Sequence, residues 1–137
     1  MKKWELFSHD ADMGIRGEGD TVEQAFAMAA MALTAVVIEP SKVPQSKEIA
    51  LDLKEEGLDF LFYEWINHLI YEMDTQKMLF SHFEVKINQG KLSAKIKGEE
   101  IKNIHEDFGV EIKGATFTEL KVFQQNNHWV AQCVVDI

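Results

Sequence analysis

The hydrophobic residues of this chain repeat with two different periods, and the change between them limits what it can fold into. From residue 58 to residue 73, apolar side chains recur every third or fourth position, which predicts a helix with one buried face. An earlier helix should begin at the capping-box pair Thr21 and Gln24 and end before Pro40. From Phe83 onward apolar and polar residues alternate, which predicts strands. This order of elements indicates an α+β fold.

Short strands are expected before, between and after the two helices. In chain order they lie around residues 4–6, 15, 49–53, 83–87, 92–96, 112–122 and 129–137. Residues 88–90 predict a tight hairpin turn, and residues 124–127 join the last two strands. We expect a single domain, residues 1–137, in which the two helices pack on one face of a mixed, mostly antiparallel sheet.

The same periodicities predict the core, because each points one stripe of side chains toward the interface between sheet and helices. The residues on these stripes are Phe26, Leu33, Leu61, Trp65, Leu69, Val85, Ile96, Ile112, Trp129 and Val135.

Composition excludes several classes of protein. The formal net charge of −9 repels phosphate backbones and argues against stable direct binding of nucleic acid, whereas metal ions or a basic protein surface suit it better. The single cysteine, Cys133, lies in an apolar strand pattern, which excludes a disulfide framework and a cysteine zinc site. The longest apolar stretch, residues 25–38, is too short to span a bilayer. We therefore expect a soluble, cytoplasmic protein without membrane contact.

Carboxylates close the last apolar strand of the chain. The strand from Trp129 to Val135 is followed by Asp136 and then by the terminal carboxyl of Ile137. A half-buried carboxylate is unfavourable unless a cation meets it. If the two ends of the chain meet, Asp12 would join Asp136 and the terminal carboxyl in an anionic, oxygen-rich cluster. Such a cluster would either bind a cation or hold a proton.

The individual residues also have simpler interpretations. His9 can form a hydrogen bond at a strand end, Asp10 can be a turn residue, and Asp12 can form an Asx turn. His68 and Glu72 lie one helical turn apart and could hold a metal, but such a pair is more often a solvated helix face. No nucleophile motif is present in the sequence.

Several short motifs, in their order and spacing, resemble those of the archease family, and the resemblance extends over essentially the full length. The matching segments are His9-x-Ala11-Asp12-x-Gly14-Ile15, Thr21-x-x-x-Ala25-Phe26-x-x-Ala29-Ala30-x-Ala32-Leu33, Trp65-x-Asn67-x-Leu69-x-Tyr71 with Asp74, Gly98-Glu99 with His105, Glu111-Ile112-Lys113-x-x-Thr116-Phe117, and Asp136-Ile137.

The resemblance implies a protein that is not an enzyme but activates an RtcB-type RNA ligase. Such a ligase joins a 2′,3′-cyclic phosphate or 3′-phosphate end to a 5′-hydroxyl end in tRNA splicing and RNA repair. The activator promotes guanylylation of the ligase and multiple turnover. By the same resemblance, Asp12, Asp136 and Ile137 hold a divalent cation such as calcium, with manganese or magnesium as other hard cations. Lys113, and with it His9, would contact the ligase.

The chain departs from the family pattern at a few positions. Asp10 stands where threonine is common, Met13 where isoleucine is common, and Gly114-Ala115 replaces Ala-Ile or Ala-Val. Thr118 replaces a frequent histidine, which bears on whether the surface around Lys113 acts as in other members.

Two other functions stay open at the level of sequence. A divalent-metal-dependent hydrolase could use Asp12, Asp136 and His9, with a metal-bound water as nucleophile. A general chaperone, or a helper of RNA modification, would suppress aggregation broadly without a ligase.

Overall fold

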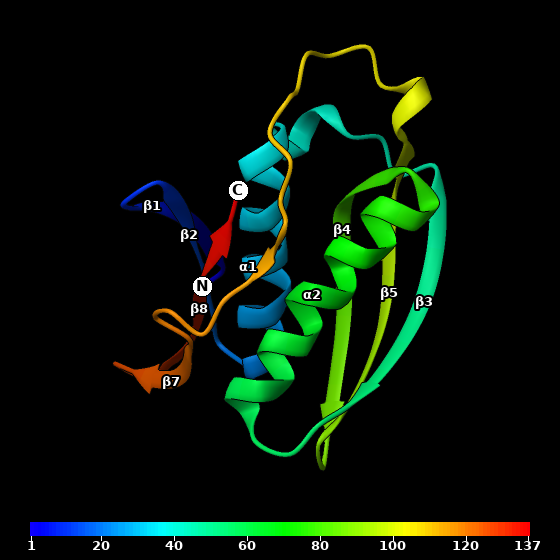
Figure 1. Cartoon of the computed structure of the whole chain (residues 1–137). Coiled ribbons are helices and arrows are strands. Elements are labelled where there is room, and N and C mark those ends of the chain that lie inside the picture. The colour runs from blue at the N-terminus through cyan, green and yellow to red at the C-terminus, as the bar shows by residue number, and fades with distance from the viewer.

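Helix α1 (Val22–Val37) lies at the centre of the molecule, between two antiparallel sheets (Figure 1). The structure, a computed structural model, describes every residue from Met1 to Ile137. One sheet has five strands in the order β1-β2-β8-β6, with β7 also paired to β8, and the other has three in the order β3-β5-β4. Helix α2 (Leu58–Gln76) packs against α1 and touches strands of both sheets. The strands are β1 (Lys3–His9), β2 (Asp12–Gly19), β3 (Lys47–Lys54), β4 (Met78–Asn88), β5 (Lys91–Glu100), β6 (Gly114–Ala115), β7 (Lys121–Gln125) and β8 (His128–Asp136).

The α+β class and both helices are confirmed, but the one mixed sheet expected from the sequence is in fact two sheets, and every strand pair is antiparallel. The reason is that α1 has no exposed residue. Its small side chains let a sheet approach on each side, and at Gly17 of β2 even a methyl group would collide with the α1 backbone at Ala25 and Ala29. The five-stranded sheet covers one side of α1, and the three-stranded sheet together with α2 covers the other.

The sequence signals that bound α1 act as predicted. The Gln24 backbone N–H donates a hydrogen bond of 3.1 Å to Thr21 Oγ1, and the Gln24 side-chain oxygen accepts one of 2.8 Å from the Asp20 backbone N–H. At the other end, Ile38 is already extended, two residues before Pro40. No helix in the structure is both long enough and apolar enough to cross a membrane.

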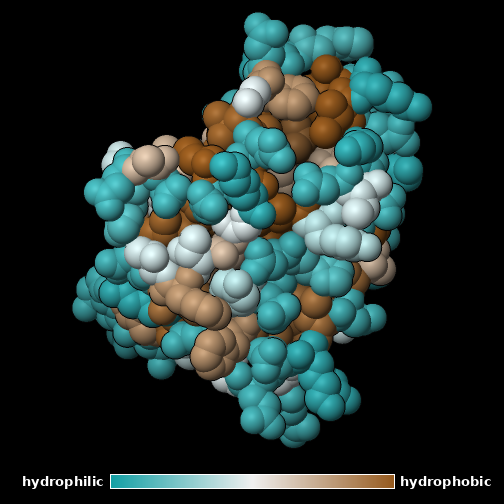
Figure 2. All heavy atoms as spheres, in the orientation of Figure 1, coloured by the Kyte–Doolittle hydropathy of each residue, from teal (hydrophilic) through white to brown (hydrophobic).

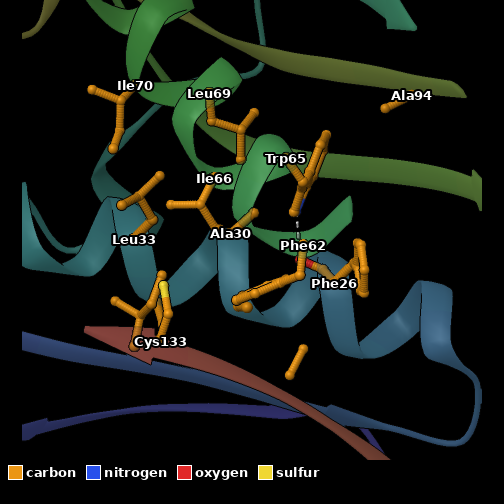
Figure 3. Packing of buried hydrophobic residues seen from close by; sticks show 14 of the residues in the cluster. Phe26, Ala30, Leu33, Phe62, Trp65, Ile66, Leu69, Ile70, Ala94 and Cys133 are labelled. Carbon is orange, nitrogen blue, oxygen red and sulfur yellow. Dashed lines mark hydrogen bonds between the residues drawn. The ribbon is translucent and has the colours of Figure 1, made fainter. Parts of the chain in front are cut away.

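Trp65 of α2 is the largest fully buried side chain and joins the two helices. Its indole N–H donates a hydrogen bond of 3.0 Å to the Phe26 backbone carbonyl in α1 (Figure 3). Its ring meets Phe83 of β4 edge to face, with centroids 6.2 Å apart. The predicted core residues are buried, except Val85 and Trp129, which are half-buried and pack against the core.

One predicted strand, residues 112–122, is interrupted. Its two parts, β6 and β7, both pair with β8, but five residues separate Ala115 from Lys121 while only two separate their β8 partners, Val135 and Gln132. The three extra residues cannot pair and form a turn, in which the Leu120 backbone N–H bonds to the Phe117 carbonyl. Hydrophobic alternation continues through this turn, so the sequence pattern does not reveal it.

Replacing Trp65 with alanine should lower the free energy of unfolding by about 3 to 5 kcal/mol, because it leaves a large cavity between α1, α2 and β4. Urea unfolding followed by circular dichroism measures this loss. Tyr71→Ala is the matched control, since Tyr71 lies on the same helix but is 59% exposed. A loss below about 1 kcal/mol for Trp65→Ala would contradict the described packing.

Candidate metal and partner site

The five-stranded sheet brings the two ends of the chain together. Strand β2 pairs with β1, where His9 lies opposite Asp12, and with β8, where Met13 lies opposite Val135. One step further along the same register, Asp12 and Asp136 are neighbours at one end of the sheet. The predicted proximity of Asp12 and Asp136 therefore follows from the observed strand pairing.

Strand alternation determines which way these side chains face. Ile15, Cys133 and Val135 belong to the core, so the residues between them point to the outer face of the sheet. His9, Asp12 and Asp136 are therefore on this outer face, because directly opposed residues of an antiparallel pair share a face. They form one row across β1, β2 and β8.

The next β2 residue on this outer face is Gly14, which lies opposite Phe7 of β1. A side chain at Gly14 would collide with the Phe7 ring. The glycine of the His-x-Ala-Asp-x-Gly segment is thus needed so that Phe7 can cover the sheet next to the His9 and Asp12 row. Asp10, in the turn between β1 and β2, has a positive φ of 55° and an almost fully exposed side chain, consistent with a turn residue.

Neither Asp12 nor Asp136 forms an ion pair with a lysine, arginine or histidine. Asp12 is half-buried and Asp136 is exposed, while the Ile137 side chain packs against the core. The backbone carbonyl of Asp136 accepts a hydrogen bond of 2.7 Å from the Lys113 backbone N–H. Lys113 itself is exposed and has no ion-pair partner, and its neighbour Gly114 is the residue directly opposite Asp136.

Asp12 and Asp136 supply two side-chain carboxylates. No group of three or more His, Cys, Asp or Glu side chains lies close enough together to hold a metal. A site at Asp12 and Asp136 would therefore take its third donor from the backbone, and the terminal carboxyl of Ile137 is the adjacent one. Carboxylate oxygens of this kind are the ligands that calcium, magnesium and manganese prefer.

The other candidates from the sequence do not form sites. His68 Nε2 lies 3.7 Å from Glu72 Oε1, with no third ligand beside them. Cys133 is buried under α1, and this burial raises the pKa of its thiol to about 12, which leaves it an unreactive core residue.

Sequence reasoning missed a buried ionic network further along the same outer face. Glu18 is 4% exposed and accepts a hydrogen bond of 2.7 Å from His128 Nε2, with Lys3 Nζ at 3.3 Å and Arg16 Nε at 3.4 Å. Burial is the largest single influence and would raise the pKa of Glu18. The hydrogen bonds from His128 and Lys3 and the charges of Arg16 and Lys3 together outweigh it, so the pKa is lowered overall. Nothing in the sequence pattern marks Glu18 as buried.

A sequence model of the Archease protein family matches residues 4–137. The chain belongs to the archease family. The archease of Pyrococcus furiosus is 37% identical to it, and that of Sulfurisphaera tokodaii 39% identical, and each alignment of 142 positions covers the whole of both chains.

Solved archease-like structures agree with the fold. The solution structure of protein 1598 from Methanobacterium thermoautotrophicum is 32% identical in sequence, covers the whole of both chains and has a TM-score of 0.86. The crystal structure of a Thermotoga maritima protein described as an archease and possible chaperone has a TM-score of 0.62 over 97% of this chain and 96% of that chain. At 18% identity, it supports the fold alone. The family and the fold class predicted from the sequence are thus confirmed.

Proposed function

We propose that this archease is a cytoplasmic, non-enzymatic activator of an RtcB-type RNA ligase in tRNA splicing and RNA repair. It holds a divalent cation at Asp12, Asp136 and the Ile137 carboxyl, and it promotes guanylylation and multiple turnover of the ligase. The observation that supports this proposal is the row at the end of the five-stranded sheet, where two carboxylates without a cationic partner lie beside the chain terminus. Family membership supports the choice of partner.

The residues around the row would each contribute to activation in a different way. A bound cation would supply positive charge and cancel the repulsion between Asp12 and Asp136. The Lys113 backbone N–H is bonded to the Asp136 carbonyl, and the exposed Lys113 side chain would contact a partner at this edge of the sheet. His9 lies in the same row and is half-exposed, which makes it the second candidate for contact.

Direct RNA binding is not part of the proposal. The net charge of −9 opposes approach of a phosphate backbone, and this protein would act on RNA only through the ligase. Of the two alternatives, a hydrolase using Asp12, Asp136 and His9 would turn over a phosphoester in the purified protein without a partner. A general chaperone would suppress aggregation of unrelated proteins without the ligase.

The direct experiment mixes the protein with an RtcB-type ligase from the same source and measures covalent guanylylation with radiolabelled GTP. The protein should increase the guanylylated fraction and the number of RNA joins per ligase. A tag added after Ile137 converts the terminal carboxyl into a peptide bond and should weaken activation. An N-terminal tag is the matched control, because it disturbs only the exposed pair between the Met1 amino group and Asp20. Equal activation by both tagged forms would exclude a role for the free terminus.

Calcium or manganese should raise the melting temperature, because a ligand that binds only the folded state stabilises it, by about 2.7 kcal/mol at a hundred times its Kd. Asp12→Asn and Asp136→Asn should abolish this rise and leave the metal-free protein equally or slightly more stable, since they remove repulsion. Asp10→Asn is the control, because its exposed side chain lies in the adjoining turn. Differential scanning calorimetry measures all three, and an unchanged metal response in both Asn variants would rule out the site.

Lys113→Ala should change the free energy of unfolding by no more than about 0.5 kcal/mol, since the side chain is exposed and unpaired. At limiting activator it should still reduce ligase guanylylation. Lys86→Ala removes an exposed lysine from the three-stranded sheet and should have no effect. The role of Lys113 would be disproved if the two variants activated equally well. Lys113 would then be a solvated lysine at a sheet edge.

A further inference from the structure

Three aromatic rings form a cluster on the surface, here called the aromatic patch. Phe60 and Tyr63 come from the first turns of α2, and Phe117 comes from the turn between β6 and β7. Phe117 stacks on Tyr63, with centroids 4.6 Å apart, and meets Phe60 edge to face at 6.3 Å. Figure 2 shows pale brown side chains at the surface over this end of α2 and the adjoining turn.

The patch is not an extension of the core. Phe60 is 54% exposed and Phe117 is 65% exposed, whereas the buried face of α2, with Trp65 and Leu69, points the opposite way. A single exposed apolar residue is ordinary in a folded protein, but a contiguous group of rings marks an interaction surface. Tyr71, 59% exposed, extends the same outer face of α2 toward its C-terminal half.

Backbone hydrogen bonds hold Phe117 in this exposed position. Thr116 donates to the Val134 carbonyl from its backbone N–H at 3.0 Å and from its hydroxyl at 2.8 Å. The Val134 backbone N–H donates to the Thr118 carbonyl at 3.0 Å, and the Thr118 N–H donates to Thr116 Oγ1 at 3.1 Å. Both neighbours of Phe117 are thus fixed to the edge of β8, so little conformational entropy is lost when a partner binds.

Charge around the patch limits what can cover it. Helix α2 contains no lysine or arginine, and two exposed acidic residues, Asp59 and Glu64, come from the same first turns as Phe60 and Tyr63. A second copy of this surface would bring like charges together, and an RNA strand would be repelled. A basic protein surface complements it, and arginine side chains can both pair with the carboxylates and stack on the rings.

The patch is connected to the proposed site by one short segment. Gly114 pairs with Asp136 at one end of the segment, and Phe117 lies three residues further along. Between them the Ala115 backbone N–H donates a hydrogen bond of 2.9 Å to the Asn67 side-chain oxygen of α2. The backbone of this segment thus runs from the strand edge beside Asp136 to the first turns of α2.

We propose that the aromatic patch and the exposed carboxylates of Asp59 and Glu64 are the docking surface for the ligase, through a basic, arginine-bearing region of its surface. This inference rests on the proposed function and names the contact surface that it requires. An enzyme that binds RNA carries basic surface, which is the charge complementary to Asp59 and Glu64.

The test measures the affinity of the RtcB-type ligase for four variants by isothermal titration calorimetry. Phe117→Ala should weaken binding at least about tenfold, as truncation of an aromatic anchor does, without lowering the melting temperature. Phe123→Ala is the matched control, because Phe123 is a half-buried ring on β7 that lies opposite Val130 of β8 and is not part of the stacked cluster. Glu64→Lys should weaken binding and reduce its salt dependence. Asp52→Lys makes the same change in net charge on the outer face of the three-stranded sheet and should leave affinity unchanged.

The outcomes separate this inference from the proposed function. If the parent protein fails to bind the ligase or to increase guanylylation, both are wrong. If the parent protein activates, but Phe117→Ala and Glu64→Lys bind as tightly as their controls, only the docking surface is wrong. Self-association of the parent protein that is lost in Phe117→Ala, seen by analytical ultracentrifugation, would assign the patch to a second copy. Binding of a single-stranded RNA that is lost in Phe117→Ala would assign it to RNA, and either result overturns the proposal.

Discussion

The close contact between the backbone of α1 and the backbone of β2 at Gly17 is the constraint on which the rest of the structure depends. Because no side chain separates them, the five-stranded sheet lies directly on one side of α1, and α2 and the three-stranded sheet complete its burial on the other. The alanines of α1 make this possible: bulkier residues would hold the layers apart, and Trp65 could no longer reach the Phe26 carbonyl. The position of the five-stranded sheet then determines where the carboxylate row and the exposed face of α2 lie.

The ionic network on the outer face fixes the register that the carboxylate row requires. Arg16 of β2 lies directly opposite Gln132 of β8 and donates a hydrogen bond of 2.8 Å to its side-chain oxygen. Glu18 reaches His128 across the same pair of strands. A slip of one residue would break both contacts and would also turn Asp12 toward the core. The network of charged residues around Glu18 thus fixes the register of β2 and β8. The same register aligns Asp12 with Asp136 at the other end of the sheet.

The sequence predicted those features that depend on neighbouring residues in the chain. It did not predict those that depend on how distant segments pack together. The ends of α1 follow from Thr21, Gln24 and Pro40, and the buried stripe of α2 follows from its period. The second sheet could not be predicted, because burial of α1 on both sides is a property of its neighbours. The proximity of Asp12 and Asp136 was predicted from the chemistry of their carboxylates, although no local sequence pattern predicts that β2 and β8 pair. The aromatic patch was missed because Phe60 and Phe117 are 57 residues apart in the sequence and meet only after folding.

The pairing of β2 with β8 has a consequence for the order in which the molecule assembles. The three-stranded sheet and α2 are built from neighbouring parts of the chain, whereas Arg16 and Gln132 are 116 positions apart. Closing so large a loop costs entropy before any contact is gained, so the local half should form early and the five-stranded sheet late. Until β8 arrives, the β1–β2 hairpin presents an open strand edge at β2, the kind of surface that recruits other chains. Completion of the carboxylate row and protection of that edge are therefore the same event.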